Sequence, residues 1–185
     1  MIETLRHIDH SAFHFINYGL ANPVFDALCP IFRNKLTWIP LYIILAFFFY
    51  RKYGTRILVI GALTGLTVLL TDQISSSLIK PFVHRLRPCN NPAVHARLLL
   101  AYCGAGYSFV SSHAANHFGI AAVLIPFTWV NRKLYGSLLL LWAFLVSFSQ
   151  VYVGVHFPVD VIAGGMLGLL IGSLVALIGK RWVPL

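Results

Sequence analysis

The sequence contains little charge. Only 10% of its 185 residues are Asp, Glu, Lys or Arg, whereas a soluble domain carries roughly 25%. Hydrophobic residues make up 58% of the chain, and the mean hydropathy is +0.79. These values exclude an ordinary soluble protein. They predict an integral membrane protein, which we expect to form a single membrane-embedded domain over residues 1–185.

Acidic residues are especially scarce, with 5 Asp and Glu against 14 Lys and Arg, which gives a net charge of +9. A basic excess is typical of nucleic-acid binding, but a chain this apolar offers no solvated basic face, so we expect no nucleic-acid partner. Anionic lipid headgroups or an anionic substrate are the expected partners. We also expect no cleavable signal peptide, because residues 1–14 hold charged and His residues and no apolar core. The sequence leaves the oligomeric state open.

Long apolar runs predict an all-α, polytopic bundle of about six membrane helices. The clear runs approach the roughly 20 residues that cross a bilayer, and they cover residues 37–50, 57–79, 108–130, 134–155 and 158–178. Residues 24–32 form a shorter run that is either re-entrant or part of a broken span. Residues 1–20 are amphipathic and predict a helix lying in the membrane interface. A helix packed on the surface of the bundle is an equally good interpretation.

Basic residues at the ends of the spans indicate the orientation of the chain. If the spans alternate in direction, three basic turns lie on one side, at residues 51–56, 132–133 and 180–181. The positive-inside rule makes that side cytoplasmic. Three polar clusters, at residues 80–88, 108–116 and 149–160, then meet on the other side. The extracytoplasmic loop 80–107 carries the first of them.

The third cluster reads SQVYVGVHFPVD and places His156 four residues before Asp160. If a helix begins near Pro158, the carboxylate of Asp160 reaches back to the imidazole. A carboxylate on one ring nitrogen fixes the tautomer and raises the basicity of the other nitrogen. The pair is then a nucleophile or a general base. A purely structural His–Asp hydrogen bond between spans accounts for the pattern equally well.

The second cluster places Ser111, Ser112 and His113 at the predicted start of a helix. Free N–H groups at a helix start bind anions, and His113 is a second candidate acid–base group. The alternative is that one of the two serines is only an N-cap.

The first cluster contains Lys80, Arg85 and Arg87, which are cations able to clamp a phosphate. Alone, it is better explained as a basic loop on lipid headgroups. The three clusters together favour phosphoryl transfer through a phosphohistidine. We expect no metal and no cofactor, because a face with many cations and few carboxylates repels a divalent ion.

These residues resemble the membrane-bound type 2 phosphatidic-acid phosphatase superfamily, whose active site is similar to that of the vanadium haloperoxidases. The motifs of that family are K-x6-R-P, P-S-G-H and S-R-x5-H-x3-D. The first matches fully from Lys80 to Pro88. The second is present at residues 110–113, with Val for Pro and Ser for Gly. The third runs from Ser149 to Asp160, with Gln150 in the position of its Arg.

The resemblance implies a role for each matching residue. It makes His156 the nucleophile, Asp160 the group that orients it, and His113 the acid for the leaving oxygen and then the base for water. It implies a phosphate-binding set of Lys80, Arg87, Ser111, Ser112 and Gln150. Gln150 lacks the charge of the Arg in the motif, so either phosphate binding is weaker, or Arg85 or Arg97 substitutes, or the protein only binds lipid phosphate. We expect an active enzyme.

The resemblance also implies the reaction. We expect hydrolysis of the terminal phosphate of a lipid phosphate or diphosphate in a bacterial inner membrane, with the site facing the periplasm. Undecaprenyl diphosphate is the first choice, and phosphatidylglycerol phosphate, phosphatidic acid and lipid A 1-phosphate are the others. A lipid-phosphate-binding or transport protein and a lipid-to-lipid phosphotransferase are the alternatives.

Cys89 and Cys103 both fall in the extracytoplasmic loop, in a compartment where disulfides persist. We expect them to pair and to pin the segment that carries Arg87. The alternative is two free thiols in a reducing compartment.

Overall fold

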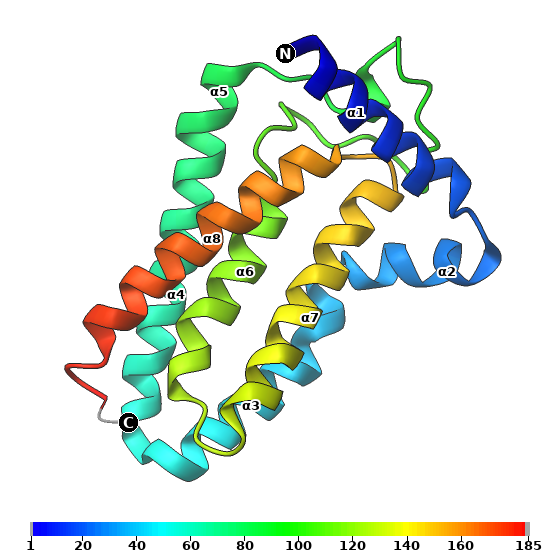
Figure 1. Ribbon diagram of the computed structural model, residues 1–185. Helices are drawn as coiled ribbons and strands as arrows, with labels where there is room; N and C mark the ends of the chain where they lie inside the picture. Colours follow the sequence, from blue (N-terminus) through cyan, green and yellow to red (C-terminus); the bar gives the residue numbers. More distant parts are fainter. Residues whose placement is uncertain (1, 184–185) are drawn as a thin grey trace.

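The computed structural model describes residues 2–183, which contain helices and no strand (Figure 1). Five helices run along the bundle, and their bounds are α3 (Ile39–Tyr53), α4 (Ile57–Gln73), α6 (Ser112–Leu124), α7 (Arg132–Tyr152) and α8 (Pro158–Gly179). The three other helices are α1 (Ile2–His14), α2 (Pro23–Phe32) and α5 (Lys80–Val83). Single turns of π or 3-10 helix join them at η1 (Phe15–Gly19), η2 (Lys35–Trp38), η3 (Gly54–Arg56), η4 (Ile74–Ile79), η5 (Pro88–Asn90) and η6 (Ile125–Phe127).

Three helical stretches are long and apolar enough to cross a membrane: Lys35–Asn90, Arg132–Tyr152 and Pro158–Gly179. The first of these contains both α3 and α4, joined by a sharp turn. The structure therefore confirms the predicted all-α membrane bundle, and most helix ends lie within a few residues of the predicted runs. The run 108–130 is the exception. Its helix α6 has only 13 residues, because residues 108–110 are irregular and the helix starts after Ser111.

Helix α6 is the centre of the bundle and contacts α4, α7 and α8. Its closest neighbour is α8, whose Gly164, Gly168 and Gly172 recur every fourth residue and face α6. A Cβ atom added at Gly168 would lie 2.1 Å from the carbonyl oxygen of Ala115, so only glycine permits this approach. The close contact places the start of α8 against the start of α6. There the N–H of Ser111 donates to a backbone oxygen of α8.

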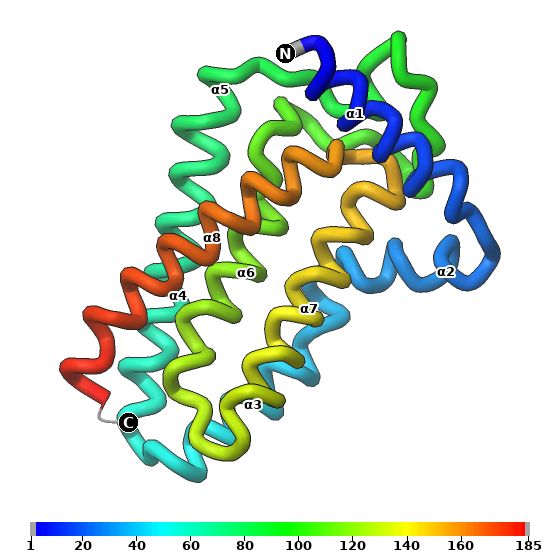
Figure 2. Tube along the Cα trace, in the orientation of Figure 1, coloured from blue at the N-terminus to red at the C-terminus, as the bar shows by residue number. Residues whose placement is uncertain are grey.

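The two ends of the bundle differ in composition. The turn between α3 and α4, the turn between α6 and α7, and the end of α8 lie together at one end (Figures 1 and 2). These are the three basic turns. At the other end lie α1, α5, the loop after α5 and the connection from α7 to α8, which carry the polar clusters. The clusters therefore meet on one face, as the alternating spans predicted.

The N-terminal helix α1 lies across the polar end. Phe13 on its inner face is fully buried and contacts Phe157, with ring centroids 5.3 Å apart. Leu5, Ile8 and Phe15 on the outer side are about 60% exposed. The structure therefore confirms that α1 packs on the bundle, and its exposed apolar side chains leave a position in the membrane interface as a prediction.

The long loop after α5 is fixed at several points. Cys89 and Cys103 form a disulfide with their Cα atoms 5.9 Å apart. The N–H of Leu99 donates to the carbonyl of Val153, and that of Ser108 to the carbonyl of Arg85. A segment with little regular structure is thereby held over the ends of α6 and α7.

Candidate active site

A cavity of about 470 Å³ opens at the polar end of the bundle. It collects residues from all three polar clusters and from two further segments. Its lining consists of Arg33, Lys80, Arg87, Leu100, Ala101, Tyr102, Gly104, Ala105, Ser112, His113, Gln150, Val155 and His156. Side chains from the helix ends that the topology brings to one face therefore line the same cavity.

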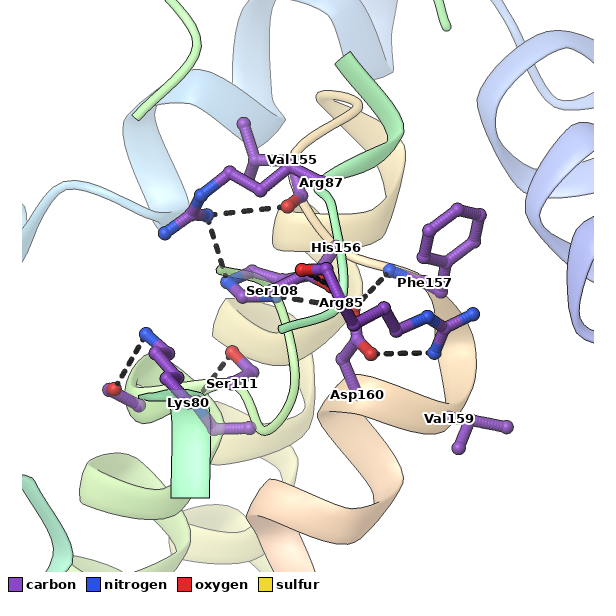
Figure 3. Close-up of polar contacts among 12 residues, drawn as sticks. Lys80, Arg85, Arg87, Ser108, Ser111, Val155, His156, Phe157, Val159 and Asp160 are labelled. Atoms are coloured by element: carbon purple, nitrogen blue, oxygen red, sulfur yellow. Dashed lines mark hydrogen bonds and ion pairs between the residues drawn. The ribbon is translucent and has the colours of Figure 1, made fainter. Parts of the chain in front are cut away.

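His156 lies in the short connection between α7 and α8 and is only 2% exposed. Its Nε2 atom is 3.3 Å from a terminal nitrogen of Arg87 (Figure 3). A guanidinium can only donate, so Nε2 accepts and the ring proton sits on Nδ1. The Nδ1 atom lies 3.5 Å from Oδ2 of Asp160. This tautomer leaves the lone pair of Nε2 on the cavity side.

Burial lowers the pKa of His156 to about 4, although Asp160 opposes this shift. Arg87 and Lys80 add to the decrease because they repel a second positive charge. The imidazole is therefore neutral at pH 7, which is the state that a nitrogen nucleophile requires.

Asp160 occupies the first turn of α8 and is fully buried. Its Oδ2 accepts the backbone N–H of Phe157 at 2.8 Å, and its Oδ1 accepts from Arg85 at 2.7 Å (Figure 3). Pro158 begins the helix, as expected. The carboxylate reaches back past the helix start, as the spacing from His156 predicted, and further contacts fix its orientation.

Arg85 supports this carboxylate from outside the cavity. Its other terminal nitrogen forms an ion pair with Asp9 of α1, and its guanidinium lies 4.0 Å from the centre of the Phe157 ring. Asp9 also accepts the backbone N–H of Val159 at 2.9 Å. Sequence reasoning missed Asp9, because its only local signal was one acidic residue on an amphipathic helix.

The two serines of the second cluster take different positions. Ser111 is the N-cap of α6, is fully buried and does not line the cavity, although we expected it to bind phosphate. Ser112 does line the cavity, and its hydroxyl accepts from Lys80 at 3.1 Å and from Ser75 at 2.8 Å. His113 follows it and also faces the cavity. The N-cap interpretation is therefore confirmed for Ser111, whereas phosphate binding by Ser112 stays a prediction.

The alternative that Arg85 or Arg97 replaces the charge missing at Gln150 does not agree with the structure. Arg85 is held by its two carboxylates, and Arg97 is bound to Asp26 at 2.9 and 3.0 Å. Neither lines the cavity. The cation beside Gln150 is instead Arg33, with its Nε 3.5 Å from Oε1. Sequence reasoning did not place Arg33 in the site.

Side chains that could bind a metal ion are not grouped in the described part of the chain. Within residues 2–183, no three His, Cys, Asp or Glu side chains are placed to hold a metal ion.

A search against family models matches residues 57–184 to the PAP2 superfamily. The chain belongs to the PAP2 superfamily. It is an integral membrane phosphatase of this type, and all three recognised motifs fall within the matched residues. Arg33 and Asp9 precede the matched segment, which is why the family pattern does not contain them.

Known PAP2 proteins resemble this chain in sequence and in fold. A lipid A 4'-phosphatase from Bacteroides thetaiotaomicron is 34% identical over 173 residues, which cover 91% of this chain and 75% of the relative. An undecaprenyl-diphosphatase from Sulfolobus acidocaldarius is 31% identical over 137 residues, covering 74% and 61%. The crystal structure of the PAP2-type phosphatidylglycerolphosphate phosphatase from Bacillus subtilis has a TM-score of 0.70. It covers 96% of this chain and 87% of that one at 24% identity, which shows a shared fold.

Proposed function

We propose that this chain hydrolyses the phosphate monoester of a lipid headgroup, with the 4'-phosphate of lipid A as the first candidate substrate. The observation that carries the proposal is the orientation of His156. Its unprotonated Nε2 faces a cavity lined by cations, while its Nδ1 proton is directed to Asp160. That arrangement suits attack on a phosphorus atom whose oxygens are held by positive charge.

The proposed reaction has two steps. In the first, Nε2 of His156 forms a bond to phosphorus while the bond from phosphorus to the lipid oxygen breaks. His113, which enters this step protonated beside the bound phosphate dianion, donates a proton to that oxygen, and Lys80 and Arg87 bind the phosphate oxygens. In the second step, His113 takes a proton from water as the water oxygen attacks phosphorus. The nitrogen–phosphorus bond then breaks and inorganic phosphate is released.

Similarity orders the candidate lipids. The lipid A 4'-phosphatase aligns with 91% of this chain, which supports a monoester on a sugar headgroup. A phosphatidylglycerophosphatase B from Bacillus subtilis aligns with 74% of this chain at 33% identity, so phosphatidylglycerol phosphate is the second candidate. The undecaprenyl-diphosphatase also aligns with 74%, at 31% identity. Undecaprenyl diphosphate, our first choice from the sequence, is therefore the third candidate.

A substrate panel tests the proposal. The purified protein in detergent, without added divalent metal, is given lipid A, undecaprenyl diphosphate, phosphatidylglycerol phosphate and phosphatidic acid, and released phosphate is measured. We expect the highest kcat/KM with lipid A, and mass spectrometry should show loss of the 4'-phosphate. Products carrying a transferred phosphate would instead indicate a lipid acceptor.

His156→Ala is the decisive variant. We expect phosphate release to fall to the uncatalysed background, while the elution volume and thermal unfolding of the protein remain those of the wild type. Release that persists in this variant contradicts the mechanism. No release from any lipid by the wild type, together with retained lipid-phosphate binding, supports the alternative of a binding or transport protein.

A further inference from the structure

Three cations line the cavity without a carboxylate partner. Arg33, Lys80 and Arg87 form no ion pair with an acidic side chain among residues 2–183. A cation that loses water without gaining a partner is costly. The positive charges of these three side chains are therefore balanced only when an anion binds in the cavity. Lys80 and Arg87 were recognised from their motif, but nothing in the sequence pattern accounts for Arg33.

Gln150 is the second unexplained polar group in the same cavity. Its side chain is fully buried in α7. Its Oε1 faces Arg33, while its Nε2 has no hydrogen-bond partner within the described residues. Leaving a buried amide donor unsatisfied costs about 1–3 kcal/mol. The orientation that puts Oε1 toward a cation leaves Nε2 available as a donor to a bound ligand.

Arg33 is fixed by the local fold. It is the residue at which α2 ends, and its backbone N–H donates to the carbonyl of Cys29. The Asn34 side chain then caps the next turn. The backbone of Arg33 is therefore held on both sides, while its two terminal nitrogens make no hydrogen bond among residues 2–183. Burial lowers the pKa of the guanidinium, but an arginine remains charged at neutral pH.

We propose that Arg33 and Gln150 form one phosphate-binding unit, in which Arg33 supplies a positive charge to the substrate phosphate and Gln150 positions it and donates a further hydrogen bond. This inference rests on the proposed phosphatase function. It explains how a cavity with Gln at position 150 keeps three cations. The charge comes from a residue 117 positions earlier in the chain, whose side chain lies beside Gln150 in the same cavity.

The test compares Arg33→Gln with the matched control Lys35→Gln. Lys35 carries the same charge two residues away, is exposed and does not line the cavity. Hydrogen bonds to charged groups are worth enough for roughly a 10- to 100-fold effect. We expect Arg33→Gln to raise the inhibition constant of inorganic phosphate and to lower kcat/KM by that factor. Lys35→Gln should stay within about twofold of the wild type.

An exchange variant makes the test specific. Gln150→Arg in the Arg33→Gln background returns one guanidinium to the cavity from α7, and we expect it to recover at least a tenth of the wild-type kcat/KM. If Arg33→Gln does not fold, Arg33→Lys keeps the charge but loses the planar fork. We expect Arg33→Lys to weaken phosphate binding about 3- to 10-fold at unchanged thermal stability.

The outcomes separate this inference from the proposed function. Wild-type phosphate affinity in Arg33→Gln, or in Arg33→Lys if the first variant is unfolded, overturns the inference. With His156→Ala inactive, the phosphatase mechanism still stands in that case. An exchange variant no more active than Arg33→Gln alone also counts against a shared binding unit, because it shows that positions 33 and 150 do not serve the same ligand. Activity in His156→Ala removes the basis of both.

Discussion

The His156–Asp160 pair has a cavity side and a supporting side. Both sides contain basic residues, but within the described residues only those on the supporting side have acidic partners. On the cavity side, Arg33, Lys80 and Arg87 have no acidic partner among residues 2–183. On the supporting side, Arg85 joins Asp9 to Asp160. Arg85 and Arg87 are only two residues apart, yet Arg85 binds two carboxylates of the fold and Arg87 faces the cavity. An arginine with carboxylate partners holds structure in place, whereas an arginine without them is free to bind an incoming anion.

The largest effect should come from the cavity side. Arg87→Gln removes the guanidinium that faces Nε2 of His156, and we expect kcat/KM to fall roughly 10²- to 10³-fold, the usual cost of losing one transition-state donor. Arg97→Gln is the matched control, because that arginine is in the same loop but is bound to Asp26 outside the cavity. Steady-state kinetics on the preferred lipid measures both. Equal losses in the two variants would show that the contrast between paired and unpaired arginines has no functional meaning.

The supporting side should affect kcat rather than binding. Asp9→Asn removes the charge that holds Arg85, so the carboxylate of Asp160 loses part of its orientation, and we expect kcat to fall about 10-fold with little change in KM. Asp26→Asn breaks the other Asp–Arg pair, which does not touch Asp160, and should leave kcat within about twofold. A rise in KM for Asp9→Asn without loss of kcat would place Asp9 at the substrate instead.

The disulfide should have a smaller effect. Arg87 follows α5 and donates to the carbonyl of Ala105, so the Cys89–Cys103 bridge joins the two segments that meet at its guanidinium. We expect Cys89→Ser with Cys103→Ser to raise KM about 2- to 5-fold by loosening Arg87, with Cys29→Ser as the control that keeps the bridge. Non-reducing peptide mapping of protein from its native membrane checks that the bridge forms there. Two free thiols would reject it.

The smallest effect concerns pH. His156 must be unprotonated to attack phosphorus, and burial sets its pKa to about 4. Protonation of the free enzyme should therefore lower kcat/KM only as the pH falls through about 4, and not near 6.5. A change near pH 6 belongs to the second ionisation of the phosphate monoester, so the acid limb is sought below pH 5. A His156 titration near 6.5, followed by NMR of the labelled ring, would show that the Asp160 carboxylate offsets the effect of burial on the pKa of His156.

The sequence predicted the parts of this architecture that depend on local patterns. Apolar runs of membrane length became α3, α4, α7 and α8, and the four-residue spacing of His156 and Asp160 placed both at the start of a helix. The roles of Ser111 and Ser112 were harder to assign, because they are adjacent. A shift of one residue in the start of α6 decides which serine is the N-cap and which lies in the first turn. Their difference depends on where α6 begins, which composition does not fix.

Arg33 and Asp9 were not predictable by this route. Arg33 meets Gln150 across 117 positions, and Asp9 meets the start of α8 across 150. Neither contact has a sequence period or a motif, because both arise from how α1 and α2 fold over the end of a bundle formed by later helices. The charge of these residues was visible, but their partners were set by tertiary packing.

The contact of α1 with the start of α8 has a consequence for how the enzyme is made. Asp9 is synthesised 150 residues before its backbone partner Val159, and before the Asp160 carboxylate that shares Arg85 with it. The proposed nucleophile, His156, belongs to the same later segment. The contacts that orient Asp160 therefore form only after α8 has been made and has met α1.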